Sequence, residues 1–272
     1  MKLKSTIAIL ALVLVAIGCA TNPFTGKQTL ALVPNSQILP MAFQQYSQFL
    51  SENKVVNNTA DARMVKDVGN KIAAAAEKYL KANGYGEYLV DYRWDYNLVD
   101  SPEVNAWCMP GGKIVIYTGI LPVTKNEAGL AAVMGHEVAH ALANHGQQRM
   151  SAGQLQQIGA VAGNVALANN PENQQIFNTA YGLGSNLGVM LPFSRSHETE
   201  ADKIGLMLMA IAGYEPIVAA ELWERMQARQ QGAPPEFLST HPSSSTRIQN
   251  IRTWAPSAKV EARKFGVTSF KR

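Results

Sequence analysis

One stretch of sequence, His136-Glu137-Val138-Ala139-His140, constrains the fold of this chain more than any other. Residues 126–150 around it carry Ala, Leu, Val and Met at intervals of three and four and contain no proline, which predicts a helix. A helix places residues four apart on the same face, so the two imidazoles can bind one metal ion. The fold is therefore expected to bury a helix that carries half of a metal site.

The metal site needs at least one more ligand. Neutral imidazole suits zinc, and a catalytic zinc site has three protein ligands and one position for water. His145 would point about 180° away from His136 on a continuing helix, so we interpret it as a structural or exposed His. Glu198 and Asp202 lie four apart in a second predicted helix, residues 194–212, and so share a face. A Glu ligand and an Asp that orients a ligating His fit this spacing; a solvated acidic face is the alternative.

The remaining sequence predicts further helices and a small sheet. Apolar residues at helical spacing indicate helices, and enrichment in Tyr, Val and Trp indicates strands. The predicted helices are residues 36–53, 59–83, 215–230 and 246–253, with two helical runs over 151–190, and the predicted strands are residues 87–98, 104–109 and 113–117. The expected fold class is α+β and mainly α-helical.

Composition excludes several classes of protein and partner. With 47% hydrophobic and 16% charged residues, the chain is neither disordered, collagen-like nor a coiled coil. The net charge of +4 is small and scattered, without a basic stripe, so nucleic acid is not an expected partner. Cys108 is interpreted as a small buried hydrophobe on a strand.

The first 18 residues have the layout of a signal peptide. Two lysines precede an apolar run from Ser5 to Ile17, and Ala16-Ile17-Gly18-Cys19 resembles a bacterial lipobox, in which the cysteine becomes the lipidated first residue. An ordinary signal peptide and a membrane-spanning helix are the alternatives, although the run is short for a span. Ala20 after the cysteine resembles sorting to the outer membrane.

A family resemblance rests on several motifs together. The metal-helix motif is followed by Glu198-Thr199-Glu200-Ala201-Asp202 and preceded by Asn105-Ala106 and Pro110-Gly111-Gly112. This combination resembles the gluzincin zinc metallopeptidase family of the CAAX prenyl proteases, HtpX and the Oma-type proteases, and with the lipobox it is most similar to the small bacterial outer-membrane lipoprotein members. The resemblance implies a zincin-like domain in which Glu198 is the third ligand and Asp202 orients the metal helix.

The resemblance also implies roles for two further segments. Asn105, Ala106 and Trp107 correspond to an edge strand beside the metal, where substrate backbone can add as another strand; by itself, Asn105 also fits a turn at a strand start. In related lipoproteins the residue matching His241 approaches the zinc, as a fourth ligand or as a catalytic donor to the reacting oxygen. From the sequence alone, His241 is a loop His before proline, and Arg247 is a structural ion-pair or helix-end residue.

The expected organisation is a lipoprotein signal peptide over residues 1–18, a lipid anchor and tether over 19–34, a zinc metallopeptidase domain over 35–255 and a C-terminal tail over 256–272. The resemblance implies a lipid-anchored endopeptidase of the bacterial cell envelope. It would sit on the outer membrane facing the periplasm, bind one Zn²⁺ per chain and cleave unfolded or misassembled envelope proteins.

Zinc would activate a water molecule in this reaction. Glu137, which points about 100° away from His136 on the helix, would act as the general base. The alternative is a latent or non-catalytic metal-stabilised lipoprotein that binds envelope proteins as a chaperone does.

Overall fold

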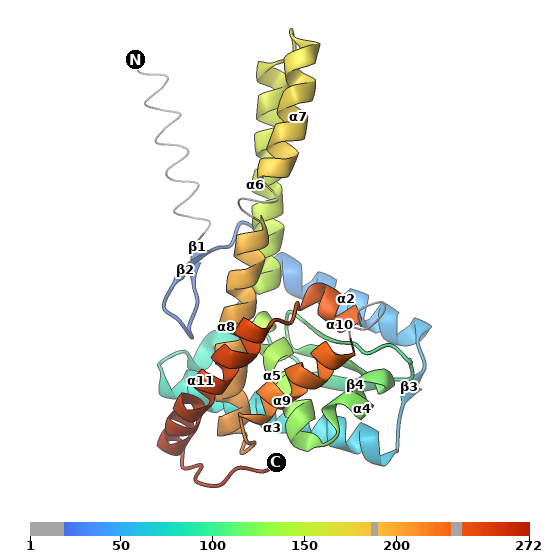
Figure 1. The fold of residues 1–272 in the computed structure, drawn as a ribbon, viewed down its shortest axis with the longest axis vertical. Coiled ribbons are helices and arrows are strands. Elements are labelled where there is room, and N and C mark those ends of the chain that lie inside the picture. Colours follow the sequence, from blue (N-terminus) through green and yellow to red (C-terminus); the bar gives the residue numbers. More distant parts are fainter. Residues whose placement is uncertain (1–18, 186–189, 230–235) are drawn as a thin grey trace. The chain divides into compact units, whose positions relative to one another are not determined.

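A computed structural model describes residues 19–185, 190–229 and 236–272 of the chain (Figure 1). The chain divides into two units: unit 1 comprises residues 1–38 and 144–197, and unit 2 comprises residues 39–143 and 198–272. The predicted signal peptide, residues 1–18, lies outside the described residues. None of the helices in the described ranges combines the length and apolarity needed to cross a membrane.

Unit 2 contains a four-stranded sheet in the order β3-β4-β6-β5. Its strands are β3 (Val55–Val56), β4 (Asp95–Val99), β5 (Ala106–Met109) and β6 (Lys113–Tyr117). β4 and β6 are parallel, whereas β3 pairs with β4 and β5 pairs with β6 in antiparallel fashion. β5 is thus an edge strand, and the turn of Pro110-Gly111-Gly112 joins it to β6, as the sequence predicted.

Helices cover both faces of this sheet. Val115 and Tyr117 of β6 pack against Tyr46 of α2 (Asn35–Glu52). Neighbouring residues of a strand point to opposite faces, so the buried Ile114 and Ile116 belong to the other face. There α3 (Ala60–Ala82) contacts β4, α5 (Glu127–Leu142) contacts β5, and the two helices contact each other. Burial of each large aliphatic or aromatic side chain in these layers contributes about 1.5–3 kcal/mol.

The strand predicted over residues 87–98 is wrong in its first half. Gly86–Leu89 forms a 3₁₀ helix, η1, and the strand β4 begins only at Asp95. The hydroxyl of Tyr88 donates a hydrogen bond to the carbonyl of Leu142 (2.7 Å), and that of Tyr92 donates to Ala141 (3.2 Å). These tyrosines cap the carbonyls at the end of α5, which draws the segment away from the sheet.

The single helix predicted over residues 126–150 is also wrong, because it consists of two helices. α5 ends at Leu142, and α6 (His145–Ala166) begins three residues later. Asn144 between them has a φ of 55°, a left-handed conformation that Asn tolerates better than most residues. No glycine or proline marks this break, so periodicity alone does not reveal it.

Unit 1 contains a strand hairpin and a helix hairpin. β1 (Cys19–Thr21) pairs antiparallel with β2 (Gln28–Leu30). α6 packs against α7 (Pro171–Ser185), which confirms the predicted pair of helices broken near Pro171. Glycines make close packing possible here, since a Cβ at Gly163 would lie 2.0 Å from the ring of Phe177.

The last helices differ from the prediction mainly in length. α8 (Leu191–Ile211) and α9 (Val218–Ala228) match the predicted helices within three residues, and α10 (Glu236–Thr240) is a further short helix. The short helix predicted over 246–253 is wrong in extent, because α11 runs from Ser245 to Lys264 through Pro256. Its buried apolar residues continue beyond the proline and offset the cost of about 3 kcal/mol that proline imposes inside a helix. The predicted boundary at residue 255 therefore falls within a continuous helix.

Candidate metal centre

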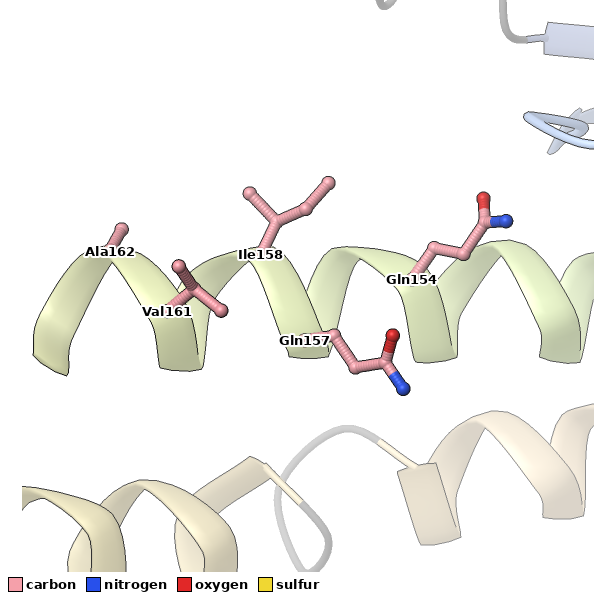
Figure 2. A pocket seen from close by; sticks show the side chains of 5 residues that line it. All are labelled: Gln154, Gln157, Ile158, Val161 and Ala162. Carbon is pink, nitrogen blue, oxygen red and sulfur yellow. The ribbon is translucent and has the colours of Figure 1, made fainter. Parts of the chain in front are cut away.

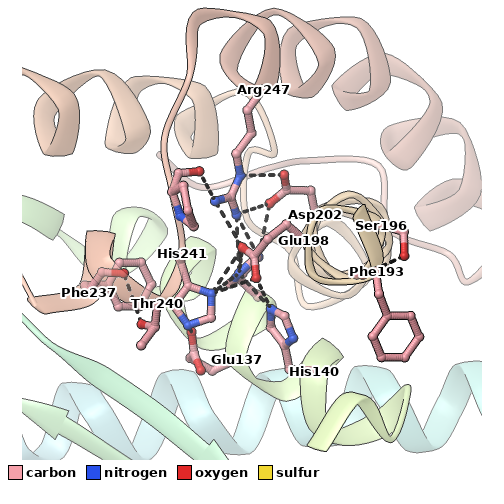
Figure 3. Close-up of polar contacts among 12 residues, drawn as sticks. Glu137, His140, Phe193, Ser196, Glu198, Asp202, Phe237, Thr240, His241 and Arg247 are labelled. Atoms are coloured by element: carbon pink, nitrogen blue, oxygen red, sulfur yellow. Dashed lines mark hydrogen bonds and ion pairs between the residues drawn. The ribbon is translucent and has the colours of Figure 1, made fainter. Parts of the chain in front are cut away.

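Four side chains of unit 2 bring their donor atoms together (Figure 3). His136 and His140 come from α5, Glu198 comes from α8, and His241 directly follows α10. The four donor atoms all lie within 4.8 Å of one another. Three of these side chains are buried and His241 is nearly so, which makes the group a shielded polar pocket inside the fold.

The distances between the donors fit a tetrahedral metal ion. His136 Nε2 lies 3.1 Å from His140 Nε2 and 3.2 Å from His241 Nδ1. The carboxylate of Glu198 lies 3.1–3.3 Å from the same three imidazoles. Zinc binds nitrogen and oxygen at about 2.0–2.1 Å, so donors at the corners of a tetrahedron around it are about 3.3 Å apart. The four residues can therefore hold zinc without rearrangement.

A close crossing of α5 and α8 brings the ligands together. A Cβ at Gly205 of α8 would lie 3.0 Å from the backbone nitrogen of His136 and 3.0 Å from the carbonyl carbon of Gly135. Two glycines in contact let the backbones approach closely, as packing of α-helices at small residues requires. Because Glu198 and Asp202 precede Gly205 by two turns and one turn of α8, this crossing carries both carboxylates to the imidazoles of α5.

Behind the donors, Asp202 and Arg247 form a buried ion pair. Arg247 donates from Nε to Oδ2 and from Nη2 to Oδ1 of Asp202, both at 2.7 Å, which is a bidentate geometry. The other contact of Oδ1 is Nδ1 of His136, at 3.1 Å. The guanidinium also lies 3.6 Å from the ring of Trp223. Asp202 can thus fix the orientation of the His136 ring, while Arg247 fixes Asp202.

Burial and close charges shift the pKa values in this group. Burial opposes ionisation of Asp202 and Glu198, yet Arg247 and the imidazoles outweigh it and lower both carboxyl pKa values, that of Glu198 far below its usual range. Burial lowers the pKa of His136, but hydrogen bonds to Asp202 and Glu198 outweigh it and raise the pKa to about 9. For His140, burial dominates and holds the pKa well below its usual range. Metal binding at neutral pH must therefore displace a proton from His136.

His241 stands between the other donors and Glu137. Its Nδ1 belongs to the donor group, whereas its Nε2 lies 3.4 Å from Oε1 of Glu137. The backbone nitrogen of His241 donates to the carbonyl of Phe237 at 2.9 Å, and its ring packs 4.7 Å from the Phe237 ring. Glu137 is buried beside the centre without belonging to the donor group, and this is the arrangement a general base requires.

The predicted edge strand runs along the same part of unit 2. Asn105 immediately precedes β5, and its side chain accepts a hydrogen bond from the backbone nitrogen of Ala106. The side chain of Trp107 packs on the rings of Tyr46 and Phe49, on the α2 face, so only its backbone is available to a ligand at the edge. Cys108 faces α5; burial raises the pKa of its thiol, and the charge of nearby Glu137 adds to this effect.

His145 and His197, which the sequence analysis assigned no ligand role, lie outside the donor group and belong to unit 1. Both side chains are buried, and their rings stack at 4.0 Å. His197 Nε2 lies 3.1 Å from the side-chain oxygen of Gln148. Their role in the described structure is packing within unit 1.

Sequence reasoning missed three contributors to the centre. Trp223 and Phe237 pack their rings against Arg247 and His241, and Gly205 permits the helix crossing. An apolar residue on a buried helix face carries no sign of what it touches, so neither aromatic could have been found from spacing. Arg247 was interpreted as an ion-pair residue, and the structure confirms this while adding its partner.

Residues 60–255, well over half of the chain, match the model of peptidase family M48, and this stretch includes all four donors. The chain belongs to peptidase family M48. This confirms the resemblance to the Oma-type proteases inferred from the motifs, and the α+β fold agrees with it.

Individual M48 relatives match parts of their own length only. The chain is 43% identical to the mitochondrial metalloendopeptidase OMA1 of Schizosaccharomyces pombe over 175 residues, 64% of this chain and 50% of that protein. It is 36% identical to the corresponding protein of Saccharomyces cerevisiae over 203 residues, 71% of this chain and 56% of that protein. It is 25% identical to the beta-barrel assembly-enhancing protease of Escherichia coli over 241 residues, 86% of this chain and 47% of that protein. The chain spans about half the length of these curated relatives.

Proposed function

We propose that this chain is a zinc-dependent metalloendopeptidase. The observation that carries the proposal is the tetrahedral spacing of His136, His140, Glu198 and His241 with the carboxylate of Glu137 beside them. Membership of the M48 family and the names of the metalloendopeptidase relatives support the same reading.

In this proposal His136, His140 and Glu198 hold one zinc ion, and Asp202 keeps the His136 ring oriented through Nδ1. A bound zinc ion would polarise the scissile carbonyl and lower the pKa of a water molecule. Glu137 takes a proton from the attacking water and later delivers one to the leaving amine. A second carboxylate in the donor group cannot do this, because the surrounding imidazoles hold the pKa of Glu198 far below the range of a useful base.

His241 closes the centre in a resting state. Its Nδ1 completes the tetrahedron, which leaves no vacant corner for water, so His241 must leave before Glu137 can act. Replacing His241 with Ala should raise cleavage if the side chain only blocks the centre, and lower it if the imidazole also stabilises the reacting oxygen. Unchanged cleavage would remove His241 from the mechanism.

The substrate is proposed to bind as an added strand on β5. An edge strand recognises extended backbone rather than a particular sequence, which suits unfolded or misassembled proteins. Asn105, Ala106 and Trp107 would contribute backbone groups, because the Trp107 ring is packed on the opposite face. The lipobox at Cys19 supports attachment to a bacterial membrane, with the outer membrane facing the periplasm as the proposed location and envelope proteins as the proposed substrates.

A non-catalytic metal-stabilised binder is the less favoured reading. A purely structural zinc site has no use for a buried carboxylate such as Glu137 next to its ligands.

Zinc content and casein cleavage test the proposal together. The full chain is purified in detergent as the wild type, as Glu137→Gln and as the control Glu52→Gln, which changes an exposed carboxylate at the end of α2. We expect about one zinc per chain in all three proteins and cleavage of unfolded casein in the wild type and the control only. Cleavage by Glu137→Gln at the wild-type rate would refute the general base, and absence of zinc from the wild type would refute the proposal.

A further inference from the structure

The helix hairpin of unit 1 is almost free of charge. Between Arg149 and Arg195 the sequence contains a single charged residue, Glu172, although 16% of the whole chain is charged. The polar side chains of this stretch are mainly Asn, Gln and Ser. Helices that face water on all sides normally carry charges of both signs, so this surface is adapted to another environment.

Large apolar side chains protrude from one face of α6. Leu155, Ile158, Val161 and Val165 are 48–71% exposed and follow one another at intervals of three and four, so they share a helix face. Figure 2 shows Ile158, Val161 and Ala162 projecting from α6, with Gln154 and Gln157 beside them. Isolated apolar residues on a surface are ordinary, but a continuous row of them indicates an interaction site. We refer to this row, residues 155–165 of α6, as the α6 stripe.

The α6 stripe continues toward the N-terminal strand hairpin. A cleft of about 340 Å³ lies within unit 1, and its apolar lining includes Leu155, Leu30 of β2, Met190 and Phe193. Leu30 pairs in register with Cys19, whose side chain is exposed. The apolar run of the sequence that precedes Cys19 therefore joins the fold at one end of the stripe.

We propose that the α6 stripe docks on a phospholipid bilayer surface, with the side chains of Ile158, Val161 and Val165 entering the boundary between headgroups and acyl chains. A lipid attached to a protein gives stable membrane binding only together with a second signal, and the stripe provides one in the same unit as Cys19. The absence of charge reduces the cost of entering that boundary. A second copy of the chain would also cover the stripe, but the tether at Cys19 keeps the bilayer at a higher effective concentration. The proposal rests on the proposed lipid attachment only for this tether.

An environment-sensitive fluorophore placed at two matched valines tests the proposal. Val161 is 64% exposed on α6, and Val260 is 55% exposed on α11 of unit 2, between Lys259 and Glu261. Each is changed to Cys in the full-length Cys19→Ser chain, which excludes lipidation, and is labelled and mixed with vesicles of phosphatidylethanolamine and phosphatidylglycerol. The chain without either added Cys gives the background from Cys108.

We expect a blue shift and quenching by brominated lipid at Val161→Cys and neither effect at Val260→Cys. In the Val161→Cys protein, a further Ile158→Gln and Val165→Gln change should remove most of the shift, whereas Val90→Gln, at an exposed apolar residue of unit 2, should leave it unchanged. Circular dichroism shows whether the helices persist. No shift at Val161→Cys, or equal shifts at both sites, would overturn the proposal, as would a shift without lipid that grows with protein concentration, since that indicates a second copy.

These readouts are independent of catalysis, because every label or substitution on the stripe lies in unit 1 and the metal centre lies in unit 2. Loss of casein cleavage would therefore refute the proposed function without touching the stripe, and loss of the fluorescence shift would do the reverse.

Discussion

Two clusters of buried histidines in this chain show what makes imidazoles a metal site. In unit 2, His136, His140 and His241 surround the carboxylate of Glu198 with their donor atoms converging. In unit 1, His145 and His197 stack face to face at 4.0 Å. Stacked rings direct their nitrogens outward in the ring planes, whereas the rings in unit 2 meet edge-on at 61–82° and direct nitrogens toward one point.

The carboxylates complete the difference between the clusters. His136 contacts Glu198 and Asp202, and their charge raises its pKa to about 9 despite burial. The polar partner of His197 given by the structure is the neutral amide of Gln148. A divalent cation needs negative charge to offset its own desolvation, so only the cluster in unit 2 is suited to bind one.

The largest effect is expected from removing a carboxylate ligand. Glu198→Ala should reduce the zinc content of the purified protein from about one per chain to none, because three imidazoles then remain without charge compensation. The matched change in the other cluster, His197→Ala, should leave the zinc content unchanged although it costs stability. Metal analysis of both proteins, with circular dichroism as the folding control, measures this. Zinc retained by Glu198→Ala would mean that the comparison misidentifies the ligand.

Removal of the orienting carboxylate should have a smaller effect. Asp202→Asn keeps the size of the side chain but removes the charge that holds His136 and Arg247. Loss of such an outer partner typically weakens metal affinity about 10–100-fold. Competition titration with a chromophoric chelator gives the affinity. Gln148→Glu, which adds charge to the His197 cluster instead, should not create a second zinc site; stoichiometry above one would show that charge alone suffices.

The pH dependence of metal binding follows from the pKa of His136. Zinc requires the neutral imidazole, so below a pKa of about 9 each binding event must release a proton, and the apparent affinity should fall about tenfold per pH unit. The metal-free protein behaves in the opposite sense: a raised pKa stabilises the fold at low pH, and this contribution is lost as the pH rises through about 9. Calorimetry at pH 7 in two buffers of different ionisation enthalpy should show release of about one proton per zinc, and release of none would contradict the shift.

How much of this was accessible from sequence differs between the ligands and their supports. The helix motif and its period located His136 and His140, and the spacing of Glu198 and Asp202 indicated a second helix face, because both signals are local. The break at Asn144 depends on left-handed backbone, and the early end of the strand region depends on hydroxyls of Tyr88 and Tyr92 that cap a helix remote in sequence. Such tertiary contacts leave no periodic trace.

The smallest effect concerns the helix crossing behind the ligands. Gly205→Ala adds one methyl group that would lie 3.0 Å from the backbone of Gly135, so α8 must move by a few tenths of an ångström. Overpacking of this kind costs about 1–3 kcal/mol, and because α8 carries Glu198 and Asp202, the same movement should weaken zinc affinity several-fold. Gly146→Ala at the start of α6 is the control, since a Cβ there meets no atom within 4 Å, and helix propensity alone should make it neutral or slightly stabilising. Thermal unfolding with and without zinc separates the two costs, because a change confined to packing lowers both melting temperatures equally. If the gap between them narrows in Gly205→Ala alone, the crossing positions the ligands as well as packing the helices.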